Sequence, residues 1–197
     1  MINWPLFILL LTFYASHSLL ADLKIKAWLK PVVPSTHYRI VYNLVSLGFV
    51  ATIAWVYINS PKVDLADFPI WVTVAGWTGF ISGFLLNYLA ISQYDGAEFI
   101  GTSYLDQPVE AQAGLGGTLN ISGINQWVRH PIYSSILMIA WSWFLISPNS
   151  AVLHIASVTT AYIPVGIYLE ERKLVIEFGD AYRKYQQEVK RLIPGVW

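Results

Sequence analysis

The sequence contains no cysteine among its 197 residues. This absence excludes disulfide bridges, thiolate metal ligands and a cysteine nucleophile. Charged residues are also scarce, at 12% of the chain, against roughly 25% in soluble domains. Twelve basic and twelve acidic residues give a net charge of zero. No overall electrostatic attraction to nucleic acid is therefore expected.

Hydrophobic residues are abundant and make up 55% of the chain. Nine tryptophans and twelve tyrosines are typical of the aromatic belts of bilayer proteins. A helix needs about 20 apolar residues to cross a bilayer. We therefore predict an all-α integral membrane protein, folded as a single domain over residues 1–197. Its five transmembrane helices are expected near residues 3–21, 40–58, 69–91, 132–147 and 149–169.

The basic residues indicate the orientation of these helices. Five spans place eleven of the twelve lysines and arginines on one side of the membrane. Because cytoplasmic loops are enriched in lysine and arginine, the N-terminus is expected outside and the C-terminus in the cytoplasm. The first stretch has no basic residues before it, so a membrane span is favoured over a cleaved signal peptide.

Two segments outside the spans are expected in the cytoplasm, namely the loop 93–128 and the tail 170–197. The tail has apolar and aromatic residues at helical spacing, which predicts a C-terminal amphipathic helix. These residues are Phe178, Tyr182, Tyr185, Val189 and Leu192.

Two polar motifs stand at the ends of predicted spans. Arg129–His130–Pro131 precedes the fourth span, with proline in the favoured first turn. It is either an ordinary helix start with an interfacial arginine, or an anion site made by free N–H groups, the positive helix end and the guanidinium. Glu170–Glu171 follows the fifth span. These acids either begin a new helix or hold a cationic or hydroxyl-bearing ligand.

Small residues and histidines within the spans favour packing roles. Gly76, Gly79 and Gly83 lie on one helix at a spacing that permits close helix contact. His17 and His154 are predicted near opposite ends of their spans, so one haem cannot bind both. Hydrogen bonds between helices are the favoured interpretation of these histidines, and no metal site is predicted.

The motifs "VRHPIY" (128–133) and "EERKLVIEFGDAYRKYQQEVKRLIP" (170–194) together resemble the isoprenylcysteine carboxyl methyltransferase superfamily. The segments "HSLLADLKIK" (17–26), "YRIVYN" (38–43) and "YDGAEFIG" (94–101) resemble its branch of NnrU-like proteins and membrane methanethiol S-methyltransferases. The resemblance implies S-adenosylmethionine bound on the cytoplasmic side, and Arg129 and His130 are the expected catalytic residues. The positions that match cofactor contacts are Gly117, Thr118, Leu119, Asn120, Asn125, His130, Pro131, Ile132, Tyr133 and Glu170.

The resemblance also limits the methyl acceptor. Prenylcysteine enzymes carry a substrate-binding arginine four residues before the acidic cofactor contact, and this sequence has Gly166 there. We therefore expect S- or O-methylation of a small thiol or lipophilic acceptor, in a bacterial inner membrane. The alternative is an NnrU-like accessory protein without enzymatic activity, related to haem or to denitrification.

Overall fold

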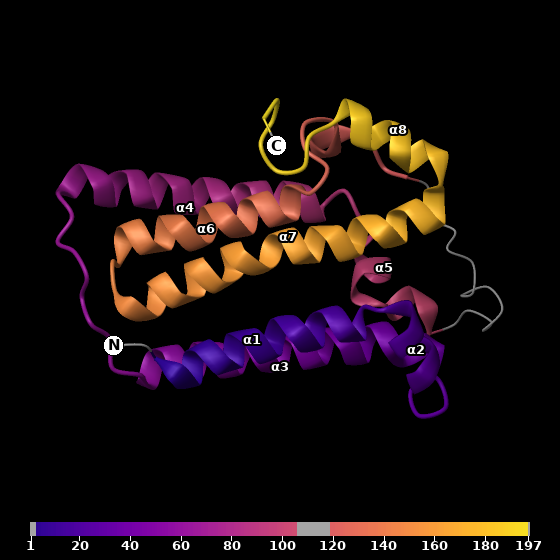
Figure 1. Cartoon of the computed structure of the whole chain (residues 1–197), viewed down its shortest axis with the longest axis horizontal. Coiled ribbons are helices and arrows are strands. Elements are labelled where there is room, and N and C mark those ends of the chain that lie inside the picture. The colour runs from indigo at the N-terminus through magenta and orange to yellow at the C-terminus, as the bar shows by residue number, and fades with distance from the viewer. Residues whose placement is uncertain (1–2, 106–118, 197) are drawn as a thin grey trace. The chain divides into compact units, whose positions relative to one another are not determined.

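The computed structural model describes residues 3–105 and 119–196, and their regular elements are all helical (Figure 1). Within these ranges two isolated β-bridges are the only strand-like pairings. The predicted all-α fold is confirmed. The described chain divides into two compact units. One contains Trp4–Ser60 and residues 94–105, and the other contains Pro61–Gln93 and residues 119–196.

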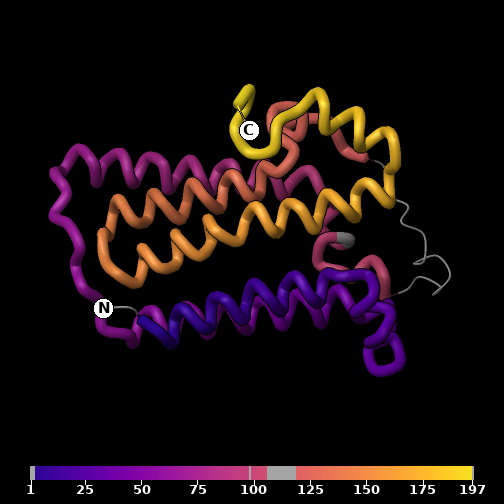
Figure 2. The backbone as a smooth tube through the Cα atoms, viewed as in Figure 1, coloured from indigo at the N-terminus to yellow at the C-terminus, as the bar shows by residue number. Residues whose placement is uncertain are grey.

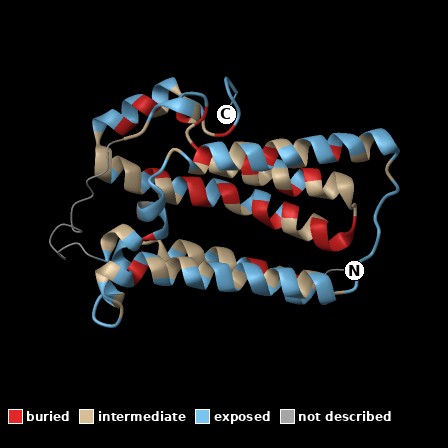
Figure 3. Cartoon of the chain, turned by 180° about the vertical axis from the view of Figure 1, so that it is seen from behind, coloured by how far each residue is buried: buried red, intermediate tan, exposed pale blue. Residues whose placement is uncertain are grey.

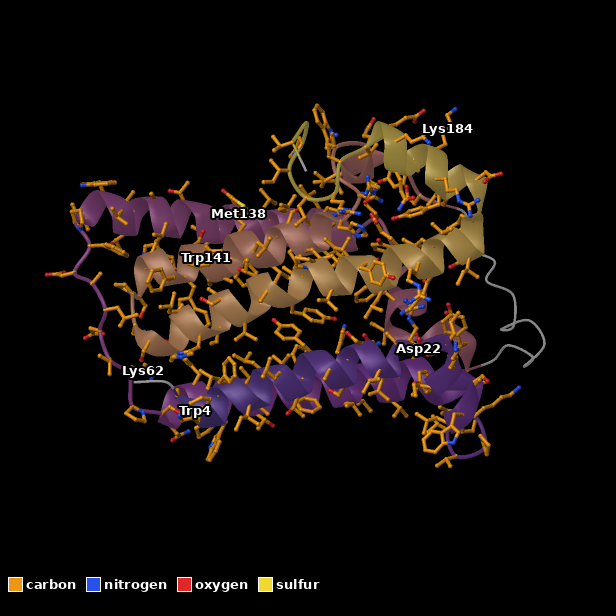
Figure 4. The ribbon with its side chains drawn as sticks, in the orientation of Figure 1. Trp4, Asp22, Lys62, Met138, Trp141 and Lys184 are labelled. Carbon is orange, nitrogen blue, oxygen red and sulfur yellow. The ribbon has the colours of Figure 1, made fainter. Side chains whose placement is uncertain are left out.

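The unit that begins at Trp4 is built on two long helices, α1 (Trp4–Leu20) and α3 (Ser35–Asn59), which pack side by side (Figures 1 and 2). Between them lies α2 (Leu23–Leu29), whose first N–H groups are capped by the Asp22 carboxylate, as labelled in Figure 4. Short helices α5 (Gly96–Ile100) and η1 (Thr102–Tyr104) follow, and Asn43 donates to the Ile100 carbonyl over 2.9 Å.

The histidines bear out the predicted packing role in part. The His17 ring lies 2.7 Å from the Tyr42 hydroxyl, which joins α1 to α3 as predicted. The His154 Nδ1 atom instead contacts the Ser150 carbonyl of its own helix. Within the described residues no group of three or more metal-ligating side chains is found.

The second unit contains α4 (Ile70–Ile91), η3 (Gly123–Gln126), α6 (Pro131–Ile146), α7 (Ser150–Phe178) and α8 (Asp180–Glu188). Helix α6 packs against both α4 and α7 (Figure 1). Most buried residues of this unit lie on α6 and α7 (Figure 3). The Asn149 side chain accepts hydrogen bonds from the first N–H groups of α7, which fixes where that helix begins.

The glycines of α4 allow close contact with α6, as predicted. A Cβ atom at Gly76 would lie 3.0 Å from the Leu145 Cβ and 3.1 Å from the Ser142 carbonyl oxygen. At Gly83 it would lie 2.8 Å from the Ile139 Cγ1. These distances are shorter than van der Waals contact, so larger residues would push the helices apart.

Gly76→Ala is therefore expected to destabilise the protein by about 1–3 kcal/mol through overpacking. Thermal unfolding in detergent, followed by tryptophan fluorescence, measures the change. Gly48→Ala on α3 is the matched control because no atom lies within 4 Å of the added Cβ. It should leave Tm unchanged or raise it, since alanine favours helix more than glycine. Equal Tm changes in the two variants would contradict the close-packing argument.

The predicted number of five spans is not confirmed. All five predicted stretches are helical, but only α3, α4 and α7 are long and apolar enough to cross a membrane among the described residues. The pair α1 and α2, bent by 78°, makes a fourth candidate. Helix α6 has 16 residues, and it rises only about 24 Å, whereas the hydrocarbon core is about 30 Å thick.

The alternative in which a new helix begins at Glu170 is wrong. Helix α7 continues through both glutamates to Phe178 and ends at Gly179, whose φ of +55° favours glycine. The sequence offers no glycine or proline between Gly166 and Gly179 to end the helix. The predicted amphipathic tail helix is confirmed only for α8, because the chain becomes extended at Val189.

Candidate functional site

The start of α6 is covered by the C-terminal segment that follows α8 (Figure 2). The Arg129 N–H donates to the Lys190 carbonyl over 2.8 Å, and the His130 N–H donates to the Arg191 carbonyl over 3.0 Å. The anion-site interpretation assumed free N–H groups here. These two N–H groups already have acceptors, so they are not available to an anion. The Leu192 side chain is buried with Ile163 and Ile167, which anchors the segment in the apolar core.

The Arg129 side chain is almost completely buried, with 6% of its surface exposed. Its guanidinium donates to the Glu171 Oε1 from Nε over 3.0 Å and from Nη2 over 2.7 Å. It also donates to the Gln186 carbonyl over 3.0 Å and to the Val189 carbonyl. The guanidinium therefore links the start of α6 to α7 and to α8, and we call this meeting point of the three helices the corner.

Glu171 is the carboxylate at the centre of this corner. Its Oε1 accepts from Arg129 and lies 3.2 Å from the His130 Nε2, and its Oε2 lies 3.3 Å from the Arg191 Nη2. A buried carboxylate is tolerated in an apolar helix when opposite charges and hydrogen bonds surround it. Three basic side chains supply those contacts here.

His130 lies between the two adjacent glutamates. Because an ionised carboxylate can only accept, the contact with Glu171 assigns the proton of the neutral ring to Nε2. The Nδ1 lone pair then faces the Glu170 Oε2 at 3.7 Å. Two acceptors facing each other attract only when a proton or a donor group of a ligand lies between them. Glu170 is half-exposed, at 44% of its side-chain surface, so a ligand can reach it.

Tyr133 and Gly166 lie together beside this histidine. The Tyr133 ring centre is 5.7 Å from that of His130. A Cβ atom at Gly166 would lie 3.0 Å from the Tyr133 hydroxyl oxygen and 3.2 Å from the Tyr162 ring. An arginine at position 166 would therefore displace both tyrosines, and the space it would need is filled by aromatic rings.

The other predicted cofactor residues surround this corner to different degrees. Pro131 is buried in the first turn of α6, and the Ile132 carbonyl accepts from the Ser135 hydroxyl. The Asn125 amide donates to the Asn120 carbonyl over 3.1 Å, and Asn120 donates to the Gln93 carbonyl over 3.3 Å. These amides fold the segment before α6 onto the end of α4.

The described part of the chain leaves some predicted contacts untested. Leu119 is half-buried beside Asn120. Gly117 and Thr118 lie outside the described residues. The cofactor contacts and the catalytic roles of Arg129 and His130 stay predictions.

Three further residues belong to the corner, namely Glu171, Arg191 and Tyr182. The sequence analysis named Glu171 only as one of a pair of candidate acids, and it assigned no site role to Arg191 or Tyr182. Tyr182 is 1% exposed, and its buried hydroxyl has no hydrogen-bond partner within the described residues. Burial, and then the charge of Glu171, raise the pKa of the Tyr182 phenol. The sequence did contain an indication of the role of Glu171. A carboxylate at the end of an apolar helix is expected to have a basic partner, and Arg129 of the other motif is a candidate.

The fold and the corner define an integral membrane protein with a buried cluster of opposite charges beside a half-exposed carboxylate. A sequence model of the NnrU protein family matches residues 5–193. The chain therefore belongs to the NnrU family.

Its relatives include the methanethiol S-methyltransferase of Pseudomonas deceptionensis, which is 29% identical over 98% of this chain and 75% of the relative. Methanethiol S-methyltransferase 1 of Bradyrhizobium diazoefficiens is 31% identical over 95% of this chain and 65% of the relative. The methanethiol S-methyltransferase of Mycobacterium tuberculosis is 27% identical over 95% of this chain and 76% of the relative. No solved structure matches the chain. These findings confirm the resemblance to the methanethiol S-methyltransferase branch.

Proposed function

We propose that this chain is an integral membrane S-methyltransferase that uses S-adenosylmethionine to methylate a small thiol. The observation that carries the proposal is the 3.7 Å contact between His130 and Glu170. The sequence resemblance assigned these two residues to one cofactor, although 40 positions separate them in the chain. The names of the relatives support a thiol as the methyl acceptor.

The residues of the corner suit the chemistry of the proposed donor. S-adenosylmethionine carries an ammonium, a carboxylate, a sulfonium and ribose hydroxyls. Glu170 can accept hydrogen bonds from an ammonium or a hydroxyl. Arg191 is 41% exposed and can attract the carboxylate. The buried hydroxyl of Tyr182 adds a further hydrogen-bonding group.

The bound donor supplies an activated methyl group, so alignment is the main task of the protein. The acceptor sulfur forms a bond to the methyl carbon while the bond from that carbon to the donor sulfur breaks, and its electron pair stays on the donor sulfur. The thiol proton goes to the His130 Nδ1. The resulting imidazolium would lie between Glu170 and Glu171, at the 3.7 Å and 3.2 Å contacts already present.

Arg129 serves this reaction as a positioning residue in our proposal. Its guanidinium bonds go to Glu171 and to two carbonyls of the α8 segment. These bonds hold the carboxylate that orients His130. We further propose a bacterial inner membrane location, with the site on the cytoplasmic side where the basic residues gather.

The alternative of a non-enzymatic NnrU-like accessory protein has less support. The curated relatives carry methyltransferase names. A Soret band in the purified protein, without binding of S-adenosylmethionine, would favour that alternative.

Calorimetry and product analysis on the detergent-solubilised protein test the proposal. We expect saturable binding of S-adenosylmethionine and transfer of its labelled methyl group to methanethiol. His130→Ala should lower turnover by about 10²-fold or more, as expected on removal of a general base. Lys184→Ala is the control, since the Lys184 side chain is 76% exposed and, within residues 3–105 and 119–196, forms an ion pair only with Glu188. A wild-type protein that binds no donor would overturn the proposal.

A further inference from the structure

The proposed function does not say which group of the donor the buried hydroxyl of Tyr182 contacts. The side chain is 1% exposed, and its ring stacks edge-on against Tyr185 at 5.8 Å. The described residues provide no hydrogen-bond partner for the hydroxyl. Buried hydroxyls normally have a partner, and an unpaired one indicates that a ligand or a water completes it.

The position of Tyr182 on α8 directs it toward the charged corner. Tyr182, Tyr185 and Gln186 share one face of the helix because they are spaced by three and four residues. The Tyr185 hydroxyl donates to the Asn125 carbonyl, and the Gln186 carbonyl accepts from Arg129. This face of α8 therefore lies against the segment that begins α6. Lys184, labelled in Figure 4, lies on the exposed face of α8.

The corner around Tyr182 is balanced in charge. Arg129 and Arg191 contact Glu171, while Glu170 lies beside His130. With a neutral imidazole, two cations and two carboxylates sum to zero. A neutral polar ligand group beside Tyr182 would leave this balance unchanged. The raised pKa of the Tyr182 phenol keeps it protonated, so it can donate a hydrogen bond at neutral pH.

A pair of neighbouring hydroxyls satisfies all of these groups. One hydroxyl can accept from the phenol while the other donates to the half-exposed Glu170 carboxylate. We propose that Tyr182 is a ligand-binding residue that donates a hydrogen bond to the ribose diol of the methyl donor. This assignment rests on the proposed function, because it takes a nucleoside-containing donor as the ligand.

Tyr182→Phe tests the assignment because it removes only the oxygen atom. The affinity for S-adenosylhomocysteine, measured by calorimetry, should fall about tenfold. The Tm of the ligand-free protein should stay the same or rise, since an unpaired buried hydroxyl has been removed. Tyr168→Phe is the matched control, because that side chain is 60% exposed and keeps its ring under Arg172. It should change neither quantity.

An analogue of S-adenosylhomocysteine that lacks both ribose hydroxyls tests whether Tyr182 contacts the ribose directly or affects binding in another way. The wild-type protein should bind the 2′,3′-dideoxy analogue of S-adenosylhomocysteine more weakly than the parent compound, and Tyr182→Phe should lower affinity for the analogue no further. Unchanged affinity for the parent compound in Tyr182→Phe would overturn the assignment while the proposed function stands. An equal loss for both compounds, or a rise only in the KM for methanethiol, would also overturn it. A wild-type protein that binds neither compound would overturn the proposed function, and this assignment with it.

Discussion

Glu171→Ala is expected to destabilise the protein by about 3–5 kcal/mol, because it leaves a buried guanidinium without its carboxylate. The Arg129 side chain is 6% exposed and cannot turn to water without breaking its bonds to α8. The loss should appear as a lowered Tm in detergent. Glu171→Gln should have a smaller effect, since the amide oxygen still accepts a hydrogen bond.

The neighbouring glutamate provides the matched control for this prediction. Glu170→Ala should leave Tm nearly unchanged, because its side chain is 44% exposed and its only ion-pair contact among the described residues is to His130 at 3.7 Å. It should instead weaken donor binding by about tenfold or more, as for a lost hydrogen bond to a charged group. Loss of the Glu171 carboxylate is thus expected to lower Tm, whereas loss of the adjacent Glu170 carboxylate is expected to weaken donor binding. A similar fall of Tm in both variants would contradict the different roles assigned to them.

The coarse fold was accessible from the sequence because long apolar stretches have few alternatives to helix in a membrane. A close helix contact also followed from the glycine spacing, and the structure shows that α6 is the partner of Gly76 and Gly83. The span count was less accessible. Helix α6 is short, and the bend between α1 and α2 falls where apolar residues run into a lysine-rich segment.

The approach of His130 to Glu170 was predicted from the two motifs, since each resembles a part of one cofactor site. The dominant partner of Arg129 was not predicted. Adjacent glutamates on a helix point about 100° apart, so the two are not buried to the same extent. Composition does not distinguish them, because that choice depends on the rotation of α7 against α6. The structure buries Glu171 and leaves Glu170 half-exposed.

The C-terminal segment was predicted as a helix because its apolar residues keep helical spacing through Leu192. The structure ends the helix at Glu188 and extends the chain from Val189. If residues 189–191 were helical, their carbonyls would accept hydrogen bonds within the segment. In the extended form they accept from the Arg129 guanidinium and from the N–H groups of Arg129 and His130. A periodicity argument does not include such long-range acceptors, which explains the error.

Ending the chain after Glu188 is therefore expected to abolish donor binding. It should also lower Tm more than Glu170→Ala or Gly76→Ala does. The truncation removes the Val189, Lys190 and Arg191 carbonyls, which accept from Arg129 and His130. It also removes the Arg191 contact to Glu171 and the buried Leu192 side chain. Each lost contact to a charged group is worth about 1.5–3 kcal/mol. Calorimetry and thermal unfolding on the solubilised protein measure both effects.

Ending the chain after Pro194 separates this role from a general need for the C-terminus. That truncation keeps every carbonyl that contacts the start of α6, and it removes the exposed Val196. Binding and Tm should both stay close to the values of the full chain. The two truncations differ by residues 189–194, and Arg191 in this segment contacts Glu171. Arg191→Ala in the full chain therefore shows how much of the effect comes from this ion pair. Donor binding that survives the truncation after Glu188 would show that the extended segment does not form the site.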